Sequence, residues 1–108
     1  MRIADADTRA RIIADLRALA DDLDARPAVP VPEIAELAVT YFPSGTDSEQ
    51  IVEVDRAAEL LGTVARWWGE HYVAELRIGA AAYRAVAIPD LHKRRHEALM
   101  SYRDNVIP

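Results

Sequence analysis

The segment from His71 to Pro89 constrains the fold most, because its sequence predicts a β-hairpin together with the register of its strands. Gly79-Ala80 is a Gly-X dipeptide, which suits a two-residue type II′ turn. With the turn there, Glu75 lies directly across from Arg84, and a shift by one residue would remove this pairing of opposite charges. One face then pairs Ile78 with Ala81, Leu76 with Tyr83, Ala74 with Ala85 and Tyr72 with Ala87, and the other pairs Arg77 with Ala82, Val73 with Val86 and His71 with Ile88.

Composition sets the class of protein. With 108 residues, the chain is expected to form a single domain, residues 1–108, with one modest core. It contains no cysteine, which excludes disulfides and thiolate metal ligands. No apolar run approaches the roughly 20 residues that span a bilayer, and the first residues carry no apolar signal-peptide region. We therefore expect a cytoplasmic protein without membrane association.

Hydrophobic periodicity predicts three helices, over residues 8–26, 47–62 and 91–103. The first two have apolar stripes at helical spacing, formed by Ile12, Leu16, Leu19, Ala20 and Leu23 and by Ile51, Val54, Ala58 and Leu61. Start and stop signals support these limits. They are Asp7 or Thr8 and Pro27 for the first helix, the capping box Thr46/Glu49 with Gly62 for the second, and Asp90 for the third.

Two further strands are expected, at 37–42 and 64–68, with a proline-rich connector at 27–32. The element order α-β-α-β-β-β-α predicts an α+β fold, a two-layer sandwich of about four mostly antiparallel strands with three helices. Alanine dominates one face of the hairpin, which lets a helix approach closely. We expect that face to form the core.

The pair Trp67-Trp68 suggests a binding surface. Adjacent side chains of a strand point to opposite faces, so a short strand can bury one ring and leaves the other to be covered elsewhere. The non-core face of the hairpin is only half polar, and Trp, Arg and aliphatic side chains together are favoured at protein interfaces. The expected partner is another protein or a second copy in a homodimer; alternatively, the first helix or the connector covers this face. The candidate interface residues are Trp67, Trp68, Val73, Glu75, Arg77, Arg84, Val86 and Ile88.

A second hypothesis is nucleic-acid binding by the last helix. Its basic cluster could neutralise phosphates while a tryptophan stacks on a base. The cluster is short and interrupted by acids, and the chain has a net charge of -5, so a solvated helix face explains it better. The residues concerned are Lys93, Arg94, Arg95 and Arg103, with Trp67 and Trp68.

Metal binding and catalysis find little support in the sequence. His92 and His96 are four residues apart on the last predicted helix, a spacing that can place two imidazoles on one metal ion. Three cations stand between them and would repel a divalent ion. There is no glycine-rich phosphate loop and no nucleophile motif. We expect no metal, no cofactor and no enzymatic activity.

Several short stretches of the sequence carry a resemblance to known proteins: Leu19–Leu23, Pro30–Pro32, Phe42–Asp47, Val54–Arg56, Tyr83–Pro89 and Met100–Tyr102. In these stretches the chain resembles a group of small uncharacterised proteins of high-GC actinobacteria and their phages and mobile elements. The resemblance spans most of the chain, and no activity is known for the group. It implies an accessory or host-interacting role.

Overall fold

The computed structural model describes residues 2–89, and the third predicted helix with its histidines and basic cluster lies outside them. The chain forms two compact units, one from Arg2 to Ala35 and one that begins at Glu36 and contains the sheet. Neither helix of residues 2–89 combines the length and the apolarity that crossing a bilayer requires.

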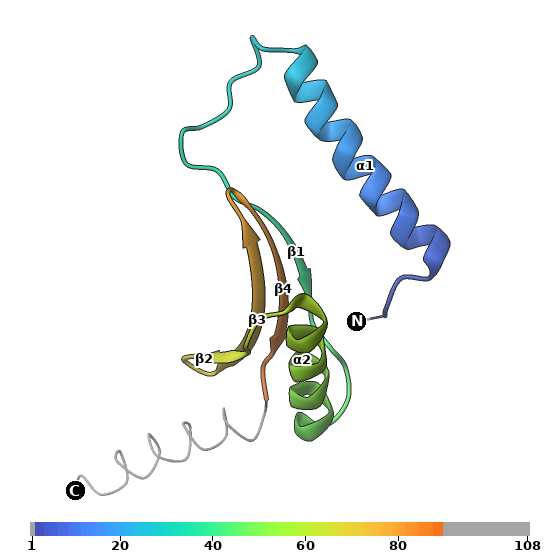
Figure 1. Cartoon of the computed structure of the whole chain (residues 1–108), viewed down its shortest axis with the longest axis vertical. Coiled ribbons are helices and arrows are strands. Elements are labelled where there is room, and N and C mark those ends of the chain that lie inside the picture. The colour runs from blue at the N-terminus through green and yellow to red at the C-terminus, as the bar shows by residue number, and fades with distance from the viewer. Residues whose placement is uncertain (1, 90–108) are drawn as a thin grey trace, which may run out of the picture. The chain divides into compact units, whose positions relative to one another are not determined.

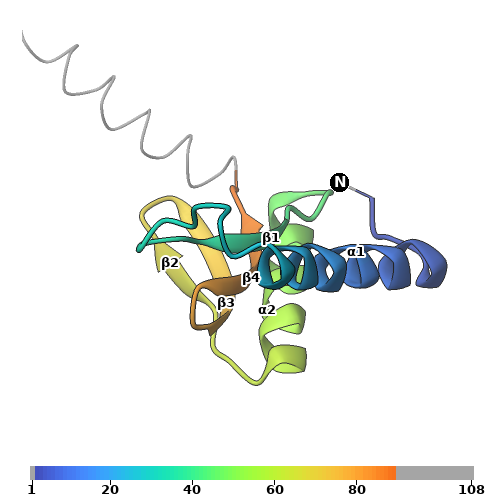
Figure 2. The ribbon, with the colours of Figure 1, turned by 90° about the horizontal axis from the view of Figure 1, so that it is seen from above.

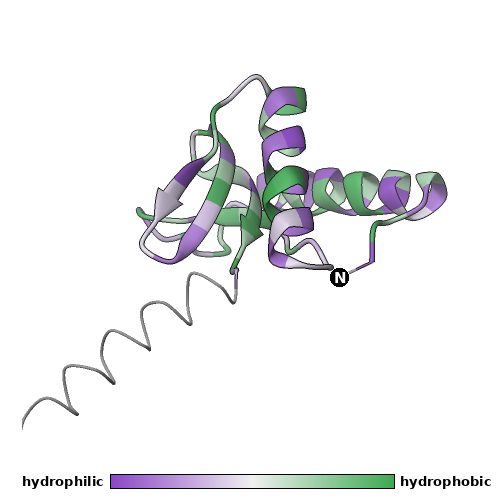
Figure 3. Cartoon of the chain, turned by 90° about the horizontal axis from the view of Figure 1, so that it is seen from below, coloured by the Kyte–Doolittle hydropathy of each residue, from purple (hydrophilic) through white to green (hydrophobic). Residues whose placement is uncertain are grey.

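The first unit contains α1 (Ala6–Ala25). The helix begins two residues earlier than predicted because Asp5, rather than Asp7 or Thr8, is its N-cap: Asp5 Oδ1 accepts a hydrogen bond from the Thr8 amide at 2.7 Å. Hydrophobic and charged residues alternate along the helix (Figure 3), and none of its residues is buried. The predicted apolar stripe therefore exists, but nothing within this unit covers it.

The second helix, α2, spans Asp47–Leu61 with Gly62 as its C-cap, which confirms the predicted start and the predicted cap. The Thr46 hydroxyl accepts from the Glu49 amide at 3.2 Å, while the Glu49 carboxylate accepts from the Thr46 amide at 3.3 Å. This reciprocal capping box satisfies two of the amides that a helix start leaves unpaired. At the other end Gly62 adopts φ 72°, the left-handed conformation that a helix C-cap requires.

Four strands form one mixed sheet in the order β1-β4-β3-β2 (Figure 1). The hairpin strands pair antiparallel, β2 pairs antiparallel with β3, and β1 pairs parallel with β4. This confirms the α+β class, while the expected three-helix, two-layer sandwich is not matched exactly, since the described residues contain two helices. The strands are β1 (Leu37–Tyr41), β2 (Arg66–Trp68), β3 (His71–Ile78) and β4 (Ala81–Ala87), so the strand predicted at 64–68 is shorter than expected.

The hairpin has the predicted register from Ile78↔Ala81 to Tyr72↔Ala87. Gly79 takes φ 58° and Ala80 has no positive φ, as a type II′ turn requires. The ladder ends at Tyr72↔Ala87, so the pairing expected between His71 and Ile88 is not part of it.

The core of the second unit lies between α2 and the alanine-rich face of the hairpin, as predicted. Because alanine has only a methyl group, the helix can approach the strands closely. Figure 2 shows α2 on one side of the strands. The buried core residues are Val54 and Ala58 from α2 with Ala74, Ala85 and Ala87 from the hairpin.

Candidate interaction surface

The sheet face opposite α2, here called the outer face, is defined by the strand register. Residues that are paired across neighbouring strands share a face of the sheet. Val86 and Arg66 therefore lie on the same face as Val73, and Arg84 lies on the same face as Glu75. Alternation along each strand adds further members. The outer face thus carries Arg66, Trp68, Val73, Glu75, Arg77, Ala82, Arg84 and Val86, together with Ala38 and Thr40 from β1.

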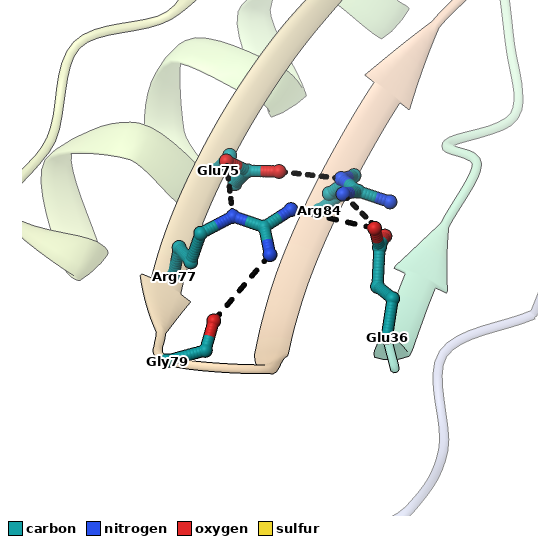
Figure 4. Close-up of polar contacts among 5 residues, drawn as sticks. All are labelled: Glu36, Glu75, Arg77, Gly79 and Arg84. Carbon is teal, nitrogen blue, oxygen red and sulfur yellow. Dashed lines mark hydrogen bonds and ion pairs between the residues drawn. The ribbon is translucent and has the colours of Figure 1, made fainter. Parts of the chain in front are cut away.

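Four charged residues form an ion-pair network on the outer face (Figure 4). Arg84 Nε donates to Glu75 Oε2 at 2.5 Å, and Arg84 Nη2 lies 2.5 Å from Glu36 Oε1. Arg77 lies 3.6 Å from Glu36 and 3.5 Å from Glu75, and it also donates to the carbonyl of Gly79 at 3.5 Å. The predicted cross-strand pair of Glu75 and Arg84 is confirmed as the centre of this network.

The network also affects ionisation. The hydrogen bond from Arg84, and then the charge of that guanidinium, hold the pKa of Glu36 below its ordinary value of 4.5. Conversely, the hydrogen bonds that Arg84 makes with Glu75 and Glu36 raise the pKa of the Arg84 guanidinium. Two cations and two anions sum to zero, so this part of the outer face is neutral, and the pairing joins β1, β4 and β3.

Trp67 and Trp68 lie on opposite faces of β2, as alternation predicts. Trp68 belongs to the outer face, where Arg84 Cζ lies 5.9 Å from the centroid of the indole ring, within cation–π range. Both side chains are about half exposed, at 45% for Trp67 and 49% for Trp68. The expectation that the core would bury one of the rings is therefore wrong, because β2 is a short edge strand.

Trp67 lies on the α2 side of the sheet, against Tyr72. The two ring centroids are 4.9 Å apart with a tilt of 48°. The Tyr72 hydroxyl donates to Asp55 Oδ1 at 2.5 Å, which links β3 to α2. This hydrogen bond is the main reason that the pKa of Tyr72 is raised above 10.0. Trp67 thus faces a different surface from Trp68, whereas the sequence hypothesis places both rings in one interface.

Two predicted interface residues are already buried. Val73 and Val86 face each other across the hairpin on the outer face, with exposures of 3% and 7%. The same face carries the longer side chains of arginine, glutamate and tryptophan as well as the short ones of Ala38, Thr40 and Ala82. Ile88 follows the end of β4 and is exposed. A partner on this face would therefore contact the Trp68 region and the charged network first, with the two valines beneath.

The basic cluster proposed for nucleic acid, Lys93, Arg94, Arg95 and Arg103, lies outside the described residues, as do His92 and His96. Within residues 2–89, no group of three or more histidine, aspartate or glutamate side chains is arranged to hold a metal ion.

Glu36 is the member of the charged network that sequence reasoning missed. It precedes β1 and reaches Arg84 because β1 pairs in parallel with β4. That pairing joins segments far apart in the sequence, and no local pattern encodes it. The one available signal was the charge of Glu36 directly before a predicted strand.

Comparisons with protein-family models, with curated proteins and with solved structures found no match for this chain.

Proposed function

We propose that this protein is a non-catalytic interaction module that binds a protein partner through the β2 end of its outer face. The supporting observation is Trp68, a large apolar side chain that is half exposed beside Arg84. The helix described in this unit, α2, packs on the opposite face of the sheet. An exposed tryptophan at this position is available to a partner.

The energetics of such a contact favour a tryptophan anchor. Burying apolar surface contributes about 25 cal/mol per Å², and tryptophan has one of the largest apolar surfaces of any side chain. Tryptophan and arginine are among the residue types most enriched at positions that dominate interface energies. Trp68, Arg84 and Arg66 together therefore have the composition of the residue clusters that contribute most of the binding energy at protein interfaces.

The charged groups of the outer face suit binding better than catalysis. The carboxylates of Glu36 and Glu75 are both engaged by Arg84 in the ion-pair network. The same pairing weighs against nucleic acid at this face, because Arg77 and Arg84 are neutralised by the two glutamates. A nucleic-acid role for the basic cluster at 93–103 stays a prediction, as do the cytoplasmic location and the phage or mobile-element origin.

Site-specific photocrosslinking in the producing cell tests this proposal. A photoreactive phenylalanine analogue at position 68 should yield a discrete crosslinked protein, identified by mass spectrometry. The same analogue at position 67 is a matched control, because Trp67 has nearly the same exposure but lies on the opposite face. Equal crosslinking from both positions, or none from position 68, would contradict the proposal.

A binding variant follows from the same geometry. Trp68→Ala should abolish the crosslink made from a neighbouring outer-face position such as Arg66, whereas Trp67→Ala should leave it intact. Val86→Glu would not serve as a binding variant, because Val86 is buried and a charge there would disturb the sheet itself. Nuclease treatment before mass spectrometry distinguishes a direct protein contact from one bridged by nucleic acid.

A further inference from the structure

The side of α2 that points away from the sheet is acidic and exposed. The helix carries five acids and one arginine, while Val54 and Ala58 face the core. Two large aliphatic side chains on the far side are exposed as well, at 66% for Val52 and 76% for Leu60. We call this surface the outward side of α2; it is formed by Glu49, Val52, Asp55, Arg56, Glu59 and Leu60.

Most of the acids on this side keep their negative charge. Glu49 accepts a hydrogen bond from the Thr46 amide, and Asp55 accepts one from the Tyr72 hydroxyl, and both donors are neutral. The cation of α2, Arg56, pairs with Glu53. Glu59 forms no ion pair within residues 2–89. The outward side therefore combines uncompensated carboxylates with two exposed aliphatic side chains, which suits a basic partner that has an apolar side.

The sign of the charge identifies that partner within the chain. A second α2 would bring acids against acids, and α1 is acidic too, with five aspartates and three arginines. Arg77 and Arg84 of the hairpin are already engaged by Glu36 and Glu75. The sequence has one run of adjacent cations, Lys93-Arg94-Arg95, here called the basic run, and it follows the described residues closely.

The connection to β4 brings the basic run within reach of α2. Ala87, the last residue of β4, packs with Val54 and Ala58 of α2, and Figure 1 shows the end of β4 beside this helix. Six residues separate Ala87 from Lys93, enough chain to span up to about 20 Å. A helix with its side chains is about 10–12 Å across. A tether of this length gives an effective concentration in the millimolar range, so a weak contact suffices.

We propose that the C-terminal segment, residues 90–108, folds back within its own chain and holds the basic run against the outward side of α2. The apolar side of the predicted helix 91–103 then meets Val52 and Leu60. This contact is independent of the proposed partner site at Trp68, because α2 packs on the other face of the sheet. It also masks the basic run, since a phosphate backbone can bind these cations only by displacing α2.

Zero-length crosslinking of the full chain tests this contact. Lys93 is the only lysine of the sequence, so its amine is a single reporter. A water-soluble carbodiimide joins an amine to a carboxylate in direct contact, forming an amide while the carbodiimide becomes a urea. Peptide mass spectrometry should find Lys93 bonded to carboxylates of the outward side of α2, in a product that stays monomeric on a denaturing gel. Raising the salt from about 0.1 M to about 1 M should lower the yield at least about fivefold, because the Debye length shrinks from about 10 Å to about 3 Å.

Matched variants show whether the charge of the basic run carries the contact. Arg94→Glu combined with Arg95→Glu keeps the amine of Lys93 and should remove the bond to α2. Arg9→Glu combined with Arg11→Glu makes the same change of charge in α1 and should leave that bond intact. Circular dichroism shows whether each variant is folded.

A relocated amine controls for the chemistry. Lys93→Arg combined with Arg77→Lys places the chain's single lysine beside Glu36 and Glu75, where Arg77 forms ion pairs. A crosslink to either glutamate shows that the reagent works in this protein, so that a missing bond from Lys93 to α2 counts against the proposal.

Several outcomes would overturn the proposal. Bonds from Lys93 confined to Asp90 and Glu97, its nearest carboxylates in the sequence, would show that the segment does not reach α2. A covalent dimer as the sole product would assign the contact to a second copy. A yield that the reversal of Arg94 and Arg95 leaves unchanged would show that the charge of the basic run does not hold the segment in place.

Discussion

Glu36 Oε1 lies 2.5 Å from Arg84 Nη2. Glu36 directly precedes the edge strand β1, and Arg84 lies in the middle of β4, with which β1 pairs in parallel. The same guanidinium holds Glu75 of β3, so one arginine connects three of the four strands. The contact therefore stabilises the one strand pairing of this sheet that is not local in sequence.

Acid should weaken this connection. The pKa of Glu36 is lowered in the folded protein from 4.5, so its contribution to the free energy of unfolding is present above pH 4.5 and is lost as the pH falls through the lowered pKa. Glu36→Gln cannot titrate and should show a smaller loss of stability between pH 5 and pH 3. Urea unfolding at a series of pH values measures this. An acid dependence of Glu36→Gln that matches the wild type would contradict the assignment.

The close approach of α2 to the sheet depends on alanine at Ala85, which is fully buried. Ala85→Leu adds three carbons where none fits and should lower the free energy of unfolding by about 1–3 kcal/mol. Ala38→Leu makes the same chemical change on an exposed position of β1 and should have little effect. Thermal or urea unfolding of the two variants compares them, and equal stability would show that the core tolerates the larger side chain.

The hydrogen bond from Tyr72 to Asp55 should make the stability of the protein depend on pH in the alkaline range. Tyr72→Phe removes it and should cost about 1 kcal/mol at neutral pH. Because the pKa of Tyr72 is raised above 10.0, its contribution to stability is present below pH 10 and is lost as the pH rises through the raised value. The wild type should therefore lose more stability above pH 10 than Tyr72→Phe does. Urea unfolding at pH 9 and above checks this, and parallel curves for the two proteins would refute it.

The hairpin turn requires glycine at position 79, where φ is 58°. Gly79→Ala places a Cβ in the left-handed region and should cost about 1–2 kcal/mol. Open space surrounds the site, so the cost comes from the backbone and not from a clash. Ala80→Ser, at a residue without positive φ, is the control and should unfold like the wild type. Equal stability of Gly79→Ala would indicate that the turn rearranges.

Local signals in the sequence predicted much of this structure correctly. The register of the hairpin follows from one glycine and one pair of opposite charges, Glu75 and Arg84, that lie close together along the chain. The ends of α2 follow from Thr46, Glu49 and Gly62, each of which acts on its own turn of the helix. Such signals can be read because the interacting groups are neighbours in sequence.

The parts that could not be predicted depend on distant contacts. The parallel pairing of β1 with β4, and with it the role of Glu36, follows from no local pattern. The burial of Val73 and Val86 was also missed, because alternation assigns both to the non-core face and does not tell what covers a side chain there. The half-exposure of both tryptophans depends on the position of β2 at the sheet edge.

The parallel pairing of β1 with β4 also determines when this sheet can form during synthesis. β1 leaves the ribosome early, but β4, its one strand partner within residues 2–89, is the last of the described strands to be made. Until then the apolar segment Leu37–Tyr41 has no place in a sheet, and unpaired apolar strands are prone to aggregate. The nascent chain can therefore be bound by chaperones or misassociate through β1 until β4 is made. A chain truncated before Ala81 would lack β4, and its β1 segment would stay unpaired permanently.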